Sequence, residues 1–182
     1  HTDRISLPWV EASTGSLGQG FSFSIGEALG LKLKNIDRDV YVMCGDGELQ
    51  EGEIWEGAMF AGHHKIDNLC AIIDYNKMQS DDLNDNIITL EPLKDKWSSF
   101  GWNVIEIDGH DFKSISDSFK EFKNTNSIPT VIIANTIKGK GVSFMESNPS
   151  WHGSLKLSYE DISNSLIDLG VPKEKVVETI NE

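Results

Sequence analysis

An aspartate and an asparagine lie at matching points of two successive apolar runs. Asp46 stands between two glycines after VYVMC (40–44), and Asn76 follows LCAIID (69–74). In an open α/β sheet, ligands sit at the carboxyl ends of the strands. The separation of 30 residues fits one turn, one helix and the next strand, so both side chains can reach the same edge. Two oxygen ligands there suit a hard cation such as Mg²⁺, which often shares its coordination sphere with phosphates.

The glycines around Asp46 add a second feature, which points to an anion. Gly45 and Gly47 allow the backbone to approach a ligand closely, since neither carries a Cβ. Backbone N–H groups at the start of a following helix can receive a phosphate. Considered alone, Asp46 or Asn76 could equally be explained as an ordinary turn residue with no ligand. Their matched placement after consecutive apolar runs favours a magnesium–diphosphate site.

The elements that must position these residues alternate along the chain. Four short apolar runs predict strands covered on both faces: 40–44, 69–74, 102–107 and 130–135. Helix-like spacing of apolar residues lies between and after them, at 16–34, 53–64, 94–100, 111–122 and 159–169. Asp111 is suited to cap its helix, and Gly170 with Pro172 to stop the last one. The fold class expected is α/β, with a mostly parallel central sheet and helices on both faces.

Two long polar segments interrupt this alternation. The stretch 77–99 crowds acidic and amide residues together before its short helix, and 136–157 is rich in glycine. Long loops in a compact domain are more often functional than idle. Lys138 and Lys140 in the second loop are either solvated or part of a mobile loop over a ligand.

Composition bounds the class of protein and of partner. The chain has 182 residues, enough for a single domain spanning 1–182, and a formal net charge of −13. This acidity argues against nucleic acid as a partner, and no apolar run is long enough to span a membrane. Cys44 and Cys70 lie inside apolar runs, where reduced buried thiols are expected. We therefore expect a cytoplasmic protein without disulfides.

The motifs together resemble a known family. GDG followed after about 30 residues by Asn is the signature of thiamine diphosphate enzymes, and the surrounding blocks resemble transketolase. These blocks run in the same order along almost the whole chain: ASTGSLGQG (12–20), GDGELQEG (45–52), EPLKDKWSSFGW (91–102), IDGHD (107–111), TIKGKGVSFME (136–146) and WHG (151–153). The resemblance implies the diphosphate-binding domain of the thiamine diphosphate-binding fold.

The resemblance also implies roles for individual residues. Asp46 and Asn76 would bind Mg²⁺ (or Ca²⁺ or Mn²⁺), with the backbone carbonyl of Met78 as a third protein ligand. The residues implied to contact thiamine diphosphate are Gly15, Ser16, Leu17, Gly45, Asp46, Gly47, Glu48, Asn76 and His152.

Catalytic roles are implied for three residues: His1, Glu51 and His152. His152 would approach the diphosphate, while Glu51, with Glu56, would link two cofactor sites across a dimer interface. Taken without the family, Glu51 and Glu56 are explained as a solvated helix face. His1 aligns with a histidine of the substrate channel. Behind it the chain departs from the family, since Thr2 replaces a usual Pro and Trp9 a usual Gly.

The remaining histidines and aromatic residues have plainer explanations. His63 and His64 are adjacent, so on a helix they point different ways and are expected to be structural or exposed. His110 is expected in a turn. The large aromatic residues of the helical segments are expected in the core or at an interface: Trp55, Phe60, Trp97 and Trp102.

Part of the expected active site has no counterpart in this chain. In the resembled family a glutamate from a second, pyrimidine-binding domain activates the cofactor, and the acidic residues here are already assigned. The start, HTDRISLPWVEAS, has no initiator Met, so we expect an N-terminal segment to be lacking. The end resembles the tail of an amino-terminal subunit of a split transketolase.

Three functions remain open from the sequence. In the first, the chain pairs with a C-terminal pyrimidine-domain subunit, in a homodimer or heterotetramer of such units. It then moves two-carbon ketol units between sugar phosphates in the pentose phosphate pathway. In the second it is a catalytically inactive cofactor- or partner-binding module. In the third it is a cut domain of a single-chain transketolase.

Overall fold

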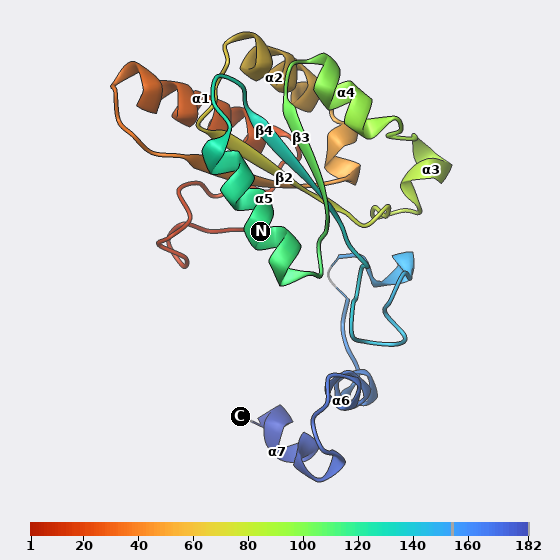
Figure 1. Ribbon diagram of the computed structural model, residues 1–182. Coiled ribbons are helices and arrows are strands. Elements are labelled where there is room, and N and C mark those ends of the chain that lie inside the picture. Colours follow the sequence, from red (N-terminus) through yellow and green to blue (C-terminus); the bar gives the residue numbers. More distant parts are fainter. Residues whose placement is uncertain (154, 182) are drawn as a thin grey trace.

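The computed structural model describes residues 1–153 and 155–181. Helices and strands alternate through most of this length, as the apolar runs predict (Figure 1). The elements are α1 (Gln19–Leu33), β1 (Val40–Gly45), the 3₁₀ turn η1 (Gly47–Gln50), α2 (Gly52–His63), β2 (Leu69–Tyr75), α3 (Asn84–Ile87), α4 (Leu93–Ser99), β3 (Asn103–Asp108), α5 (Phe112–Asn124), β4 (Thr130–Asn135), η2 (Pro149–Trp151), α6 (Tyr159–Asp168), η3 (Lys173–Lys175) and α7 (Val176–Asn181).

The strands form a sheet of order β1-β2-β4-β3 in which every pair is parallel. All carboxyl ends therefore lie at one edge. Gly45 at the end of β1 is in register with Asp74 of β2. Asp46 and Asn76 each follow their strand at this edge, as the spacing predicts. The predicted α/β class with a parallel sheet is confirmed.

Helices cover both faces of the sheet, and alternate strand residues point to each. One core cluster joins the inward faces of α1, α2 and α4 to strand residues such as Val42, Ile73 and Val131. The second cluster is smaller and joins Ile132 and Ile105 to Phe122 of α5. The near-continuous apolar runs suit β2 and β4, which bury side chains on both faces. The expectation of cover on both faces is wrong for β1, because this strand lies at the sheet edge and leaves Tyr41 and Met43 47% and 69% exposed.

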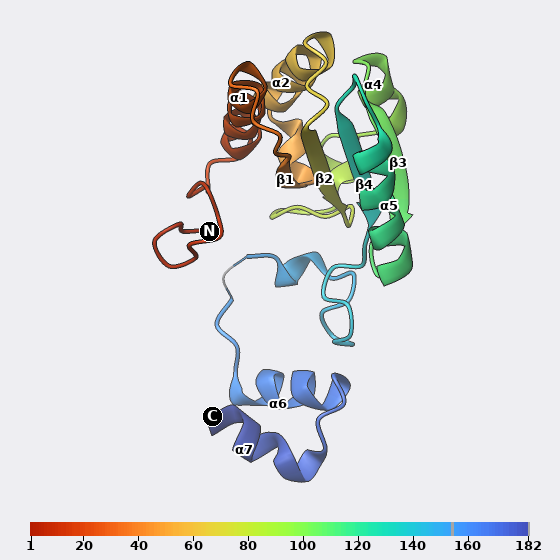
Figure 2. The ribbon, with the colours of Figure 1, turned by 60° about the vertical axis from the view of Figure 1, so that its left-hand side comes forward.

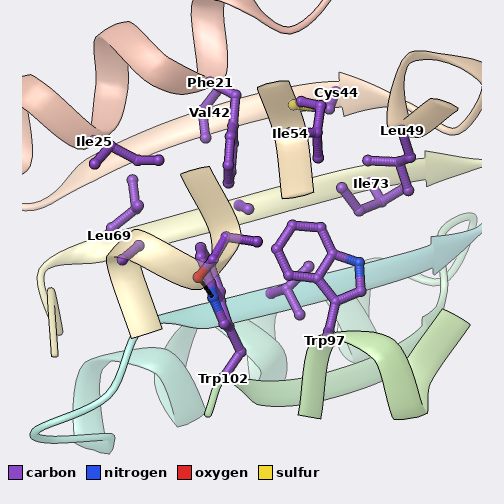
Figure 3. Packing of buried hydrophobic residues seen from close by; sticks show 14 of the residues in the cluster. Phe21, Ile25, Val42, Cys44, Leu49, Ile54, Leu69, Ile73, Trp97 and Trp102 are labelled. Carbon is purple, nitrogen blue, oxygen red and sulfur yellow. Dashed lines mark hydrogen bonds between the residues drawn. The ribbon is translucent and has the colours of Figure 1, made fainter. Parts of the chain in front are cut away.

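Aromatic side chains fill the larger core (Figure 3). Trp97 of α4 is fully buried and lies 4.8 Å from Trp102 and 6.0 Å from Phe21 between ring centroids. The indole N–H of Trp102 donates to the carbonyl of Ala58 at 2.8 Å, which joins the start of β3 to α2. Trp55 is partly buried against this cluster, whereas Phe60 is 41% exposed and lies outside the core.

The two cysteines are buried and free, as expected. Burial raises the pKa of Cys70 to about 12 and that of Cys44 further still, so both thiols stay protonated near neutrality. Among the described residues, no helix combines the length and the hydrophobicity needed to cross a membrane.

The C-terminal helices lie apart from the sheet (Figure 2). Ser158 and Asp161 form a capping box at the start of α6, and the helix ends just before Gly170, which adopts φ 90°. The predicted stop at this glycine is confirmed. The short helices α3 and α7 are additional to the predicted elements, and α1 begins at Gln19 because residues 16–18 form a turn.

Candidate functional site

Asp46 lies directly behind the end of β1 and is 1% exposed. Its Oδ1 accepts a hydrogen bond from the N–H of Gly47 at 2.7 Å, and its Oδ2 accepts one from the N–H of Lys77. Lys77 is the residue after Asn76. The carboxylate therefore bridges the chain segments that follow β1 and β2, which brings the two predicted ligand segments together.

Asn76 closes a tight turn at the end of β2. Its Oδ1 accepts from the N–H of Met78 at 3.0 Å, and Met78 is 7% exposed. Lys77 between them has φ 67°, a left-handed conformation that turns the chain back across the sheet edge. The turn places the Asn76 amide and the backbone around Met78 beside the Asp46 loop.

Burial dominates the electrostatics of Asp46. It raises the pKa of this carboxyl, while the Asn84 amide and the N–H groups of Lys77 and Gly47 act in the opposite direction. The nearby Asp74 adds a further unfavourable charge. A cation at this edge would relieve the cost of a buried carboxylate, because an opposite charge favours the ionised form.

Several buried polar atoms near this turn have no hydrogen-bond partner within residues 1–153 and 155–181. They are Oε1 of Gln79, both amide atoms of Asn84, and Nδ1 of His152. Gln79 and Asn84 lie against Gly47: a Cβ at that glycine would fall 2.7 Å from Cβ of Gln79 and 3.7 Å from Oδ1 of Asn84. Native proteins pair most buried polar groups, so unpaired ones mark a place where a polar ligand fits.

His152 belongs to the same region although it is far away in sequence. Burial lowers the pKa of its imidazole first, the positive charge of Lys138 lowers it further, and the Asp46 carboxylate opposes both effects. Lys138 is half-buried and forms no ion pair among the described residues. The segment 136–153 thus places a histidine near Asp46 and a cation near that histidine, which suits a bound anion.

Two contacts anchor that segment where it leaves β4. The Thr136 hydroxyl hydrogen-bonds the carboxylate of Asp74, and the N–H of Ile137 donates to Nε2 of His110 at 2.8 Å. His110 lies in the turn before α5, as expected, and it also ties this turn to the loop. The start of the loop is therefore bound to β2 and to the turn that follows β3.

His1 and Gly15 form a second group of predicted site residues. The imidazole packs on the glycine so closely that a Cβ there would lie 2.8 Å from Nδ1 of His1. With Ser16, Leu17 and Glu48 they line a groove of about 620 Å³ between α1 and the free edge of β1. Asp46, Asn76 and His152 do not line this groove, so the predicted residues fall into two groups.

Glu48 connects the two groups. Its Oε1 accepts from the N–H of Gly18 at 2.9 Å and its Oε2 from the N–H of Gly45 at 3.0 Å. Both carboxylate oxygens are thus engaged in holding the loop before α1 against the end of β1. The sequence predicts Glu48 only as a cofactor contact, and this bridging role is a finding of the structure.

Glu51 and Glu56 are exposed at the start of α2. Glu51 caps the helix with its backbone conformation and makes no capping side-chain hydrogen bond. Their expected role between two cofactor sites stays a prediction. His63 and His64 are exposed at the end of the same helix, as expected.

The donor set fits a hard cation with a diphosphate. Among the described residues, no three His, Cys, Asp or Glu side chains converge as metal ligands. A cation here would instead take Asp46 together with amide and carbonyl oxygens, which Mg²⁺ and Ca²⁺ accept. The sequence missed Gln79 and Asn84; the signal for them was the crowding of polar residues in 77–99.

Comparisons with protein-family models and with individual proteins lead to the same family. Residues 1–181 match the family described as the thiamine diphosphate-binding domain of transketolase. The chain is 46% identical over 160 residues to a 6-deoxy-6-sulfo-D-fructose transketolase subunit of Clostridium sp., covering 88% of this chain and 58% of that protein. It is 42% identical over 148 residues to an apulose-4-phosphate transketolase subunit of Phocaeicola vulgatus, covering 81% and 53%. The chain spans about half the length of these relatives.

Solved structures give the same match at the level of the fold. Transketolase from Campylobacter jejuni superposes with a TM-score of 0.84 at 31% identity, covering 96% of this chain and 29% of that one. A transketolase from Pichia stipitis, in complex with xylulose 5-phosphate, gives a TM-score of 0.86 at 28% identity and covers the whole of this chain.

Proposed function

The chain belongs to the transketolase family as its thiamine diphosphate-binding domain, and from this we propose that the edge formed by Asp46 and Asn76 binds the magnesium–diphosphate end of the cofactor. Asp46, Asn76 and the Met78 carbonyl hold the cation in this proposal. The buried, bridging position of Asp46 is the observation that carries it.

The remaining residues of the site support the diphosphate. Gly47 leaves room for a close backbone approach, since a Cβ there would collide with Gln79. His152 and Lys138 offer hydrogen-bond donors in the same region, and the His152 Nδ1 is buried and has no partner among the described residues. When bound, thiamine diphosphate supplies the carbanion and the electron sink; the protein orients it.

The reaction proposed is transfer of a two-carbon ketol unit between sugar phosphates. The relatives named above are called subunits of transketolases, and this chain spans about half of their length. We therefore propose a partner chain that carries the pyrimidine-binding domain, with a homodimer or a heterotetramer as the complete assembly. Glu51, Glu56 and His1 would act at the interface and in the substrate channel. The free, buried cysteines suit the cytoplasm as the compartment.

Calorimetric titration of thiamine diphosphate with Mg²⁺ tests the proposal. The chain is titrated alone and together with the pyrimidine-domain chain. Binding should tighten strongly with the partner, because half a cleft leaves much of the cofactor in water. Asp46→Ala should abolish binding, whereas Asp81→Ala, which removes an exposed carboxylate from the neighbouring loop, should not.

The same mixture then separates an enzyme from an inactive binding module. Ketol transfer from a ketose phosphate should require both chains, Mg²⁺ and Asp46. Binding without transfer would favour the inactive module. Absence of binding with and without the partner would refute the site.

A further inference from the structure

Beside the Asp46–Gly47 turn, the amide of Asn84 and the amide oxygen of half-buried Gln79 are buried and have no hydrogen-bond partner among the described residues. Asn84 is 3% exposed, and neither its Oδ1 nor its Nδ2 makes a hydrogen bond of normal geometry with any described residue; Oε1 of Gln79 is buried and unpaired as well. We propose that these amides form one wall of the diphosphate site and contact the magnesium–diphosphate unit directly. This inference rests on the function proposed above and assigns it two further binding residues.

The backbone of the segment explains why the amides point inward. Met78 and Leu83 pair as an isolated antiparallel bridge, and the N–H of Gln79 donates to the carbonyl of Asp82 at 3.0 Å. The N–H of Asn84 donates to the carbonyl of Lys77, also at 3.0 Å. The chain thus folds back on itself through backbone bonds and the side chains of Asn76 and Asp82. The amides of Gln79 and Asn84 are not used to close the turn and remain free for a ligand.

Their position relative to the proposed ligands is close. A Cβ at Gly47 would lie 3.6 Å from Oε1 of Gln79 and 3.7 Å from Oδ1 of Asn84. The Asn84 amide also favours the charged form of the Asp46 carboxyl and so lies near it. The amides therefore face the same turn that supplies Asp46 to the cation and the Gly47 backbone to the diphosphate.

Amide chemistry suits both parts of this ligand. The carbonyl oxygen can face the cation, directly or through one of its waters, and the NH₂ group can donate to phosphate oxygens. A buried amide atom without a hydrogen bond lowers the free energy of unfolding. The three such atoms of Gln79 and Asn84 therefore favour a ligand that can hydrogen-bond with them. An occupant without hydrogen-bonding groups would not relieve that cost.

Asn84→Ala separates a binding role from a structural one. The substitution removes two unpaired buried atoms but also the favourable effect of the amide on the Asp46 carboxylate, so the melting temperature of the ligand-free chain should change little. Affinity for thiamine diphosphate with Mg²⁺, measured by calorimetry with the partner chain present, should fall about tenfold, as for a lost hydrogen bond to a charged group. Gln79→Ala should behave in the same way. Asn86→Ala is the matched control, because Asn86 is an exposed residue of the same short helix.

Asn84→Asp tests which part of the ligand the amide contacts. The carboxylate keeps an oxygen for the cation but loses the donor and adds a negative charge. Binding of Mn²⁺ alone, followed by electron paramagnetic resonance, should be as strong as in the unmodified chain or stronger. Binding of thiamine diphosphate should be weaker than in Asn84→Ala, because the added charge repels the phosphates.

The outcomes distinguish this inference from the function on which it rests. If Asp46→Ala abolishes cofactor binding while Asn84→Ala and Gln79→Ala bind as tightly as the unmodified chain, the amides are not ligands and only this inference falls. A lower melting temperature of ligand-free Asn84→Ala, with unchanged affinity, would also overturn it. If the unmodified chain binds nothing even with its partner, the proposed function falls and takes this inference with it.

Discussion

At the scale of single residues, the site is built from groups that are held in unfavourable states. Asp46 is a buried carboxylate whose pKa is raised by burial, and the imidazole of His152 has its pKa lowered by burial and by Lys138. Groups with shifted pKa values cluster at functional sites, because a bound ligand there can supply the charge or hydrogen-bond partner that these groups lack. Their effects are measurable in the protein without any ligand.

The lowered pKa of His152 predicts a pH dependence of stability. Below about pH 6.5 the unfolded chain binds a proton at this imidazole more readily than the folded chain does. The free energy of unfolding should therefore fall as the pH drops through 6.5, until the folded pKa is also passed. Urea denaturation at pH 7.5 and 5.5 should show a smaller fall for His152→Gln. His63→Gln, which removes an exposed imidazole, corrects for the general effect of losing a histidine.

An imidazole titration followed by NMR gives an independent check. The His152 resonance should have its midpoint below the ordinary value of 6.5. A midpoint at or above that value, or an equal pH dependence of stability in the unmodified chain and His152→Gln, would contradict the burial argument.

The sequence predicts some site residues better than others, for a physical reason. The places of Asp46 and Asn76 after apolar runs predict a shared edge, and the structure joins their segments through the Asp46–Lys77 hydrogen bond. Gln79 and Asn84 carry no comparable signal, because their burial depends on how the chain folds back after Met78. The bond of Glu48 to Gly18 likewise depends on a tertiary contact that spacing does not reveal.

At the scale of elements, apolar runs predict the strands closely and the short helices poorly. All four predicted strands occur within one residue of their expected bounds, because each run buries at least one face in the core, and β2 and β4 bury both. The 4-residue α3 and the 6-residue α7 carry too few apolar positions to show a helical period. The sheet order does not follow from the sequence, since β4 inserts between β2 and β3 only through packing of the crossovers.

The close contact between α2 and the end of α4 predicts that a methyl group added at Gly62 lowers the free energy of unfolding. A Cβ at Gly62 would lie 1.8 Å from the backbone carbonyl oxygen of Phe100, which cannot move aside as a side chain would. Gly62→Ala should therefore reduce the free energy of unfolding by about 2–3 kcal/mol, in spite of the better helix propensity of alanine. Chemical denaturation measures this directly.

Gly26 in α1 is the matched control. A Cβ at this position would meet no atom within 4 Å, so only the change in propensity remains. Gly26→Ala should raise the free energy of unfolding by about 0.5–1 kcal/mol. Equal effects of the two substitutions would show that α2 does not approach Phe100 as closely as the structure has it.

At the scale of the whole molecule, one aromatic cluster holds three helices to one face of the sheet. Trp97 lies at its centre and is fully buried, but its indole N–H has no hydrogen-bond partner in the part of the chain that the structure describes. Trp97→Ala should cost about 3–5 kcal/mol, because it leaves a large cavity among α1, α2 and α4. Trp97→Phe should cost less, about 1–2 kcal/mol, since it keeps most of the packing and removes an unsatisfied donor. Urea unfolding of both variants measures which of them loses more free energy of unfolding. If Trp97→Phe is as unstable as Trp97→Ala, the indole N–H must make a stabilising hydrogen bond.

The C-terminal helices have few buried contacts with the rest of the molecule. None of the described side chains of α6 is buried, and the helix is tied to the loop after β4 by Asp168, whose carboxylate accepts from the N–H and the hydroxyl of Ser143 at 2.8 and 2.7 Å. Elements with few buried contacts open locally at low free energy, while central strands open only with the whole fold. The C-terminal helices and the central strands should therefore differ widely in hydrogen exchange, with α6 and α7 fast and β2 and β4 slow.

Asp168→Ala tests whether that tie also orders the loop that carries Lys138 and His152. Without the carboxylate, amides of 141–146 and of α6 should exchange faster, while those of β2 and β4 keep their rates because the sheet loses no contact. Glu160→Ala, an exposed change in the first turn of α6, should leave the loop unaffected and serves as the control. If α6 exchanges as slowly as β2 in the unmodified chain, the C-terminal helices unfold together with the sheet, and Asp168 is then only one of several contacts that hold them.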